Sequence, residues 1–288
     1  MPALLDVLCL GEALWDLNAP RGVPFARATR IDLAPGGAAV NVALHLTKLG
    51  RRAGLCAVVG DDALGQALVA RVAAAGVDVS RVTSAPPRTG LCFVERAGET
   101  RRIVGYRASD ERVPSAPREI GARVLFLTGL SPDAAQLSSF TKAARRARRQ
   151  RATVVIDVNA RPRMWAGKDG SEAPALLREA DLLRCSTEDL RAMGLSIEAI
   201  RASMRAKAAL IVSDGAGATR AYGPFGAVER RPRAARVVDP TGAGDALSAG
   251  ILAELCGGGE DLGAAETWER AIDRGHALAR AHLLRRGP

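Results

Sequence analysis

The feature that most constrains the fold of this chain is a series of short apolar runs that alternate with helical segments. Helical spacing of apolar residues is clear in 38–50 and 61–76, and both segments close on a glycine, a common helix stop. Continuous apolar strands are buried on both faces, which is typical of a parallel sheet covered by helices. We therefore predict an α/β fold whose strands are 6–11, 54–60, 123–129, 153–158, 181–186 and 208–215.

Two segments interrupt this alternation. Residues 12–34 lack helical periodicity, and residues 89–108 resemble two strands around an Ala-Gly-Glu turn. We predict that they form a small β flap over the edge of the main sheet. No long linker, repeat or low-complexity segment divides the chain, so we expect one domain over 1–288.

The charge balance is strongly basic, with a formal net charge of +10 and a pI of about 10.2. Such a balance favours anionic partners, including small anions such as nucleotides. The densest basic run, 142–151, follows Ala134, Leu137, Phe140 and Ala144 at helical spacing, so we interpret it as the solvated face of a helix. A nucleic-acid patch is the alternative. Aromatic residues make up only 3% of the chain, which argues against a base-stacking surface, and we expect no nucleic-acid partner.

The five cysteines are odd in number, widely spaced and without a CxxC pair, which argues against a disulfide framework or a zinc site. Most lie in apolar stretches, and we expect core thiols. The first twelve residues contain two acids and no basic start, unlike a signal peptide. No apolar run approaches the ~18 residues of a membrane helix. We therefore expect a cytoplasmic protein without a membrane partner.

The stretch VVDPTGAGDALSAGIL, residues 237–252, has the order strand end, turn and helix. Small residues at Gly242, Ala243 and Gly244 let the backbone approach a ligand closely. The free N–H groups and the dipole of a helix start attract anions, so these residues resemble a phosphate cradle. Asp245 would repel a passively bound phosphate, but it suits a base that takes a proton from an attacking hydroxyl. The alternative is that Asp245 only caps the helix.

Two motifs in this chain resemble signatures of one family. DPTGAGD (239–245) resembles the C-terminal signature of the ribokinase-like carbohydrate kinases, the phosphofructokinase B group. PGGAAVNVALHLTKLG (35–50) resembles their N-terminal signature, about 200 residues earlier. The resemblance covers nearly the whole chain. It implies a Rossmann-like three-layer αβα sandwich with a mostly parallel central sheet and a small β lid, formed by about 12–34 and 88–110.

The same resemblance implies the catalytic and sugar-binding residues. Asp245 is the implied base, and Gly242, Ala243 and Gly244 form the implied anion hole. GEALWDL (11–17) resembles the strand end whose Asp binds sugar hydroxyls, although an exposed loop Asp is the alternative. Two arginines suit a phosphate or carboxylate, since a guanidinium binds either in a bidentate way, but a surface role is open for each. The implied sugar-binding residues are Asp16, Gly36, Gly37, Asn41, Arg107 and Arg161.

On the nucleotide side, IVSDGAGATRAYG (211–223) resembles the family's nucleotide stretch, with compressed spacing. CSTEDL (185–190) stands where the family has N-x-x-E, which organises Mg²⁺ through water. Either Glu188 or Asp189 serves there, because Mg²⁺ keeps several waters and needs few protein ligands. The implied ATP-binding residues are Ser213, Gly215, Gly217, Thr241, Gly242, Gly244 and His276, the last near the adenine.

These features predict an ATP- and Mg²⁺-dependent sugar kinase that phosphorylates a primary hydroxyl. The run DVNARPRMW (157–165) resembles fructokinases and 2-keto-3-deoxygluconate kinases. Fructose is the expected substrate, and 2-keto-3-deoxygluconate is the alternative. Further alternatives are ribose, a nucleoside, or binding without turnover. Family members are often dimers through the lid, so a homodimer is also expected. The chain has no Walker A motif and no complete GxGxxG, which disfavours P-loop kinases and classical dinucleotide enzymes.

Overall fold

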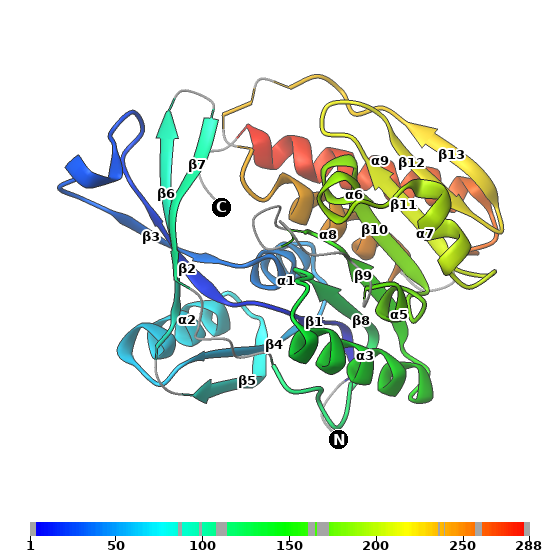
Figure 1. Cartoon of the computed structure of the whole chain (residues 1–288), viewed down its shortest axis with the longest axis horizontal. Helices are drawn as coiled ribbons and strands as arrows, with labels where there is room; N and C mark the ends of the chain where they lie inside the picture. Colours follow the sequence, from blue (N-terminus) through cyan, green and yellow to red (C-terminus); the bar gives the residue numbers. More distant parts are fainter. Residues whose placement is uncertain are drawn as a thin grey trace.

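We describe the fold from a computed structural model of the chain. It contains a larger sheet whose strands are mostly parallel and a smaller sheet whose strands are mostly antiparallel. Helices cover both faces of the larger sheet (Figure 1). The structure describes residues 4–85, 88–97, 100–107, 114–160, 165, 173–235, 237–238, 240–256 and 261–284.

The larger sheet has nine strands within the described residues, in the order β13-β12-β11-β10-β9-β8-β1-β4-β5. The pairs from β11 through β1 to β5 are parallel, and an antiparallel hairpin of β12 and β13 ends the sheet. The predicted apolar strands are therefore confirmed, with small shifts at their ends. The strands are β1 (Leu5–Leu10), β4 (Ala53–Gly60), β5 (Asp78–Ala85), β8 (Ala122–Thr128), β9 (Thr153–Asp157), β10 (Leu182–Ser186), β11 (Ala209–Ser213), β12 (Thr219–Gly223) and β13 (Gly226–Arg230).

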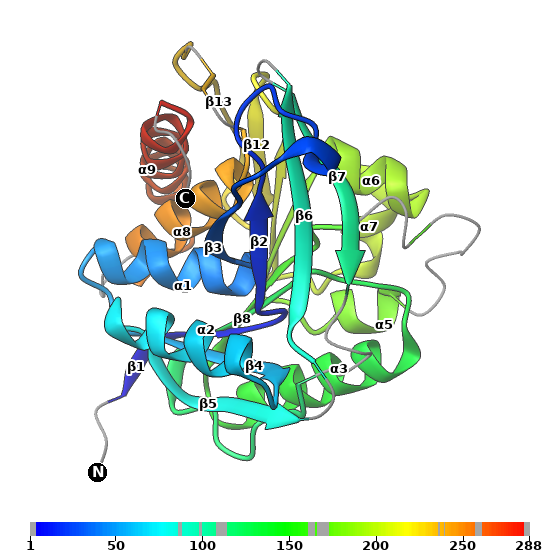
Figure 2. The same cartoon turned by 90° about the vertical axis from the view of Figure 1, so that its left-hand side faces the viewer.

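The smaller sheet, which we call the lid, has the order β3-β2-β6-β7. It projects from the body beyond the carboxyl end of β1, which leads directly into β2 (Figures 1 and 2). This confirms the predicted flap, although the tip at 98–99 lies outside the described residues. The elements are β2 (Leu14–Asn18), the short 3-10 helix η1 (Phe25–Arg27), β3 (Asp32–Gly36), β6 (Gly90–Ala97) and β7 (Thr100–Arg107).

The helices form two layers, one on each face of the large sheet (Figure 2). Each layer packs against its own apolar cluster of the sheet, so the architecture is a three-layer α/β/α sandwich. One layer holds α1 (Ala38–Lys48), α2 (Ala63–Ala74), α8 (Ala243–Leu255) and α9 (Ala265–Leu283). The other holds α3 (Ala134–Arg149), α5 (Ala173–Leu177), α6 (Thr187–Met193) and α7 (Ile197–Ser203).

The segment just before α8 differs from our prediction. We expected a strand end in residues 236–239, but Val237 and Val238 belong to no strand, and 236 and 239 lie outside the described residues. The sheet already ends at β13, and the chain then crosses to α9, where the N–H of Val238 donates to the carbonyl of Leu283 at 2.9 Å. The turn that begins α8 is therefore held by a helix rather than by a neighbouring strand.

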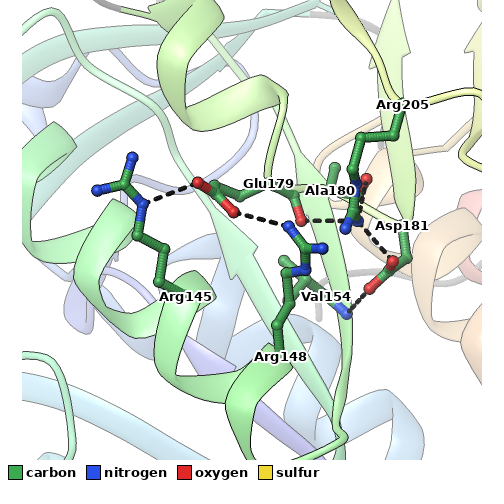
Figure 3. A network of polar contacts seen from close by, with 7 residues as sticks. All are labelled: Arg145, Arg148, Val154, Glu179, Ala180, Asp181 and Arg205. Carbon is green, nitrogen blue, oxygen red and sulfur yellow. Dashed lines mark hydrogen bonds and ion pairs between the residues drawn. The ribbon is translucent and has the colours of Figure 1, made fainter.

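Most of the basic run 142–151 lies on α3, which ends at Arg149. The other side of α3 is buried through Leu137, Phe140 and Ala144, as predicted, whereas Ala134 is exposed. The charges of the run are partly neutralised within the chain (Figure 3). The carboxylate of Glu179 accepts hydrogen bonds from Arg145 at 2.8 Å and from Arg148 at 3.1 Å. These contacts tie α3 to the segment that enters β10 and support the reading of a structural helix face.

Glu179 gives this network a pH dependence. Burial raises its pKa, but hydrogen bonds and charge from Arg145 and Arg148 outweigh burial, so the pKa lies below its usual 4.5. The stabilisation is therefore present above pH 4.5 and is lost as the pH falls through the lower pKa of the folded state. We expect Glu179→Gln to cost about 0.5–1 kcal/mol at neutral pH, since both arginines are partly exposed.

Thermal unfolding from pH 7 to pH 3 checks this, and the difference from wild type should vanish at the acid end. Glu229→Gln, which breaks exposed ion pairs with Arg220 and Arg231, is the matched control and should have a smaller effect at neutral pH. A difference for Glu179→Gln that persists unchanged at pH 3 would contradict the assignment to charge.

All five cysteines are buried free thiols, as predicted. Burial raises the pKa of Cys56 to about 11 and that of Cys185 to about 12, so these thiols are protonated at neutral pH. Within the described residues, no helix combines the length and the apolar character that crossing a membrane requires.

Candidate active site

The first turn of α8 forms the centre of the site. Gly242 is the residue before the helix and has a φ of +76°, in the left-handed region that favours glycine. Ala243, Gly244 and Asp245 are the first three helical residues. Amides at a helix start lack intrahelical acceptors, although here the N–H of Ala243 donates to the carbonyl of Pro240 at 3.3 Å. Asp245 is buried, with 8% of its surface exposed. The predicted cradle and the predicted base therefore share one helical turn.

The carboxylate of Asp245 is held from the neighbouring helix α1. The side-chain amide of Asn41 donates to Oδ2 of Asp245 at 2.8 Å, across 204 positions in sequence. The carbonyl oxygen Oδ1 of Asn41 is buried and has no hydrogen-bond partner among the described residues. Asn41 therefore carries an unused acceptor directly beside the carboxylate of Asp245.

The start of α1 lies against the base of the lid. Gly37 precedes α1 with a φ of +97°, and a Cβ at this position would collide with the carbonyl oxygen of Glu12. A Cβ at Gly36 would lie 2.8 Å from Cγ of Asp16, so this glycine leaves room for the Asp16 carboxylate. Asp16 is itself buried in β2. The predicted Asp16, Gly36 and Gly37 are thus adjacent, close to Asn41 at the start of α1.

Arg107 ends β7 and is paired with Leu91 of β6, which in turn pairs with Trp15 of β2. The paired residues Trp15, Leu91 and Arg107 form one row across the lid strands, and Asp16 lies in the next row. Both rows are at the end of the lid nearest the body. The side chain of Arg107 lies outside what the structure describes. The other predicted arginine, Arg161, also lies outside the described residues.

The predicted nucleotide stretch begins where β11 ends. Ser213 is buried, and its hydroxyl accepts a hydrogen bond from Arg184 at 2.7 Å. Gly215 follows with a φ of +53°, and a Cβ at Gly217 would lie 2.8 Å from a carboxylate oxygen of Asp214. The two glycines therefore allow a tight turn beyond the strand end, while the Ser213 side chain points into the protein.

The predicted adenine neighbour, His276, lies on α9 beside the continuation of this stretch. Its Nε2 shares a hydrogen bond of 2.9 Å with the hydroxyl of Thr219 in β12. Burial lowers the pKa of His276, so the neutral ring is favoured near pH 7. The structure thus brings His276 and the 213–219 stretch together.

The two candidate metal residues differ in their surroundings. Asp189 is buried, and its carboxylate accepts hydrogen bonds from the backbone of Ala160 and Ser186 and from the Ser186 hydroxyl. Together with Ser186 it forms a capping box at the start of α6. Glu188, one residue earlier, is exposed. Across the described part of the chain, no group of three or more His, Cys, Asp or Glu side chains is arranged to hold a metal ion.

Sequence reasoning missed a buried polar cluster below the cradle. Arg184 of β10 donates to Oδ1 of Asp157 at 3.0 Å, and the hydroxyl of Ser248 in α8 donates to Oδ2 of Asp157 at 2.7 Å. Burial raises the pKa of Asp157, and Arg184 and Ser248 oppose this rise. A charged residue inside an otherwise apolar strand, as in DLLRCS, was the available signal.

His282 of α9 was also missed. Its Nε2 donates to the carbonyl oxygen of Thr241, in the turn before α8, and its ring contacts His45 of α1 edge to face at 5.3 Å. A Cβ at Gly242 would lie 3.4 Å from this ring nitrogen. Both α1 and α9 therefore hold the turn that shapes the cradle.

Comparison with known proteins agrees with this geometry. The model of the pfkB family carbohydrate kinases matches residues 4–288. Relatives include a 2-dehydro-3-deoxygluconokinase of Thermoproteus tenax, 27% identical over 87% of this chain and 82% of the relative. A 5-dehydro-2-deoxygluconokinase of Bacillus velezensis is 25% identical over 88% of this chain and 83% of its own. The crystal structure of a Xylella fastidiosa fructokinase with bound ATP has a TM-score of 0.82 and 25% identity, and it covers 98% of this chain and 93% of that one.

The chain belongs to the PfkB family of carbohydrate kinases. It is accordingly a phosphotransferase that acts on a sugar hydroxyl, and its three-layer fold with a lid is that of the ribokinase-like kinases. The resemblance inferred from the two sequence motifs is confirmed.

Proposed function

We propose that this kinase transfers the γ-phosphate of ATP to a primary hydroxyl of fructose. The observation that carries the proposal is the position of Asp245 in the first turn of α8. Gly242 and Gly244 precede it in the proposed cradle, and the side-chain amide of Asn41 donates a hydrogen bond to its carboxylate. The ATP-bound fructokinase from Xylella fastidiosa, which shares the fold, supports the choice of nucleotide and sugar.

In this proposal the reaction is one in-line displacement. Asp245 accepts the proton of the sugar hydroxyl, whose oxygen forms a bond to the γ-phosphorus. The bond from that phosphorus to the β–γ bridging oxygen breaks, and ADP leaves. The first-turn amides of α8 stabilise charge on the transferring phosphoryl group, which is mainly an electrostatic and positioning task. Asn41 fixes the orientation of the base, and Asp16 holds the sugar from the lid side.

Mg²⁺ is the proposed cofactor, and two exposed carboxylates are present that suit an ion bound through water. Glu188 in the first turn of α6 and Asp214 directly after β11 are exposed carboxylates that can hold the water shell of a nucleotide-bound ion, although Oδ1 of Asp214 also accepts a hydrogen bond from Thr187 at 2.7 Å. Asp189 is occupied as a helix cap. Bound Mg²⁺ would neutralise charge on the phosphates. ADP release that stops on chelation and returns with added Mg²⁺ would support this role.

The test of the function is ADP release with ATP, Mg²⁺ and a panel of fructose, 2-keto-3-deoxygluconate, ribose, glucose and adenosine. We expect the highest kcat/KM on fructose. A higher value on another panel member would replace the substrate but keep the kinase. ATP binding without turnover of any member would favour the alternative of a binding protein.

A second candidate substrate is 2-keto-3-deoxygluconate. The Thermoproteus tenax relative supports it, and so does the position of Arg107 in the lid row next to Asp16. A guanidinium at this place suits the carboxylate that fructose lacks.

If the acid is bound in this way, Arg107→Ala should raise KM for 2-keto-3-deoxygluconate on the order of 10-fold to 100-fold, the scale of a lost charged hydrogen bond. The KM for fructose should change far less. Arg102→Ala is the matched control, since this arginine of the same strand is 73% exposed and pairs with Glu95. Steady-state kinetics on both sugars decides, and equal effects of Arg107→Ala on both would rule out a carboxylate clamp.

A homodimer through the lid also stays a proposal. Leu33 of β3 and Val104 of β7 are large apolar side chains that are 40% and 37% exposed on the two edge strands of the lid, and such edges are available for pairing with another chain. Analytical ultracentrifugation of wild type and of Leu33→Lys with Val104→Lys would test it, with a shift to monomer as the expected result.

A further inference from the structure

The buried cluster below the cradle contains a cation that the roles proposed so far do not use. Arg184 lies in the middle of the sheet with 8% of its surface exposed. A Cβ at Gly244, the second residue of α8, would lie 3.4 Å from Nη1 and 3.5 Å from Nη2 of Arg184. The guanidinium therefore lies directly against the backbone of the first turn of α8, one residue before Asp245.

The geometry points to a function for this cation: we infer that Arg184 is a positioning residue that sets the electrostatics of the phosphate cradle from beneath. It rests on the proposed function, because the cradle must receive the transferring phosphoryl group. Arg184 itself touches no substrate in this inference. It acts through the backbone of α8, which it supports, and through its fixed positive charge.

The first argument is that Arg184 places a second source of positive charge directly beneath the start of α8. The amino-terminal end of a helix carries a partial positive charge, so a guanidinium beside it is repelled. The charge is nevertheless retained. Burial acts to lower the pKa of Arg184, but the charges of Asp157 and Asp189 outweigh it and the pKa lies above its usual value. A phosphoryl group on the far side of the turn would interact favourably with both sources of positive charge.

The second argument is that stability alone gives a poor reason for this pair. Replacing a buried ion pair with apolar residues is often neutral or stabilising, because both ions lose their hydration. The layer beneath Arg184 is already apolar, with Phe126, Val155 and Ile211 lining a small gap of about 10 Å³. An aliphatic side chain would suit this place, yet the chain keeps an arginine whose Nε is buried without a partner among the described residues.

The third argument is that Arg184 links three elements that all approach the reacting centre. Its Nη1 contacts Asp157 at the end of β9, its Nη2 contacts Ser213 at the end of β11, and Asp157 reaches Ser248 in the second turn of α8. The start of α8 is thereby fixed relative to the strand end that precedes the nucleotide stretch. A shift of the cradle by about 1 Å can cost on the order of 10²-fold in rate.

The test compares Arg184→Lys, which keeps the charge, with Arg184→Gln, which removes it. Removing the charge of Arg184 alone would leave the buried carboxylate of Asp157 without its ion-pair partner. The decisive variant is therefore the double change Arg184→Gln with Asp157→Asn, which leaves a neutral pair. Asp157→Asn alone is its control. Thermal unfolding first shows which variants fold, and Arg184→Lys remains informative if the double variant does not.

For folded Arg184→Gln with Asp157→Asn we expect kcat to fall on the order of 10-fold to 100-fold, below the loss for a direct oxyanion donor. The KM for the sugar should change less than about 3-fold, a split that simple misfolding does not produce. Arg184→Lys should recover part of kcat. A folded double variant with kcat within about 2-fold of wild type would overturn the inference.

A binding measurement separates this inference from the proposed function. Calorimetric titration with Mg-ADP alone should give wild-type affinity for the double variant, whereas Mg-ADP with aluminium fluoride and sugar, a mimic of the transferring phosphoryl group, should bind on the order of 10-fold to 100-fold more weakly. Equal weakening of both ligands would overturn the role of Arg184. If wild type itself neither turns over a sugar nor binds the mimic, the proposed function has failed instead.

Discussion

Asp245→Asn should lower kcat on the order of 10²–10⁴-fold while leaving the protein folded. Asparagine has the shape of aspartate, so α8 keeps its first turn. The carboxamide oxygen can still accept the hydrogen bond that Asn41 donates to Oδ2 at 2.8 Å. What is lost is a group that takes the proton of the attacking hydroxyl. Steady-state ADP release on the best panel sugar measures kcat, and Mg-ADP affinity should stay near the wild-type value.

The competing explanation from the sequence is that Asp245 caps the helix, but Gly242 occupies the cap position and Asp245 is the third residue of α8. A genuine cap elsewhere in the chain provides the control. Asp133 caps α3 by accepting a hydrogen bond from the backbone of Gln136 at 2.8 Å, on an exposed surface. Asp133→Asn should cost a fraction of a kcal/mol and leave kcat unchanged, since Asn and Asp cap helices about equally well. If Asp245→Asn behaves in the same way, the base in the proposed mechanism is wrong.

The sequence predicted the strands and helices well where burial alone decides them. The continuous apolar runs that became β1, β4 and β8 leave few alternatives, since a parallel sheet is buried on both faces. Val237 and Val238 show the limit of this signal. Two β-branched residues favour a strand, but the sheet had already been closed by the β12–β13 hairpin, and that is a property of the whole fold.

The candidate site was predicted as a set of strand ends and helix starts, but the direction of its side chains was not. Ser213 is predicted to lie along the phosphates, and the sequence did not indicate that its hydroxyl accepts a hydrogen bond from Arg184, 29 positions earlier. The amide of Asn41 reaches Asp245 across 204 positions. Contacts of this kind depend on which strands become neighbours and on the packing of α1 against α8, for which a single sequence contains no local signal.

Gly37→Ala is expected to give the largest loss of stability among the changes considered. The φ of +97° at Gly37 lies where side chains are strained, and the added Cβ collides with the carbonyl oxygen of Glu12, in the short connection from β1 to the lid. Backbone strain and overpacking together should cost about 3–5 kcal/mol of unfolding free energy. Urea unfolding measures this cost.

The matched control is Gly22→Ala, because it separates backbone strain from collision. Gly22 also has a positive φ, +78°, but a Cβ there meets nothing within 4 Å, so we expect a cost of about 1–2 kcal/mol. If Gly37→Ala folds, α1 or the lid connection must have moved, and Asp16 and Asn41 with them, so KM for the sugar should rise. Equal destabilisation by both alanines would mean that the backbone at Glu12 moves away from the new Cβ at little cost in free energy. The connection between β1 and the lid would then be more flexible than the close contact at Gly37 implies.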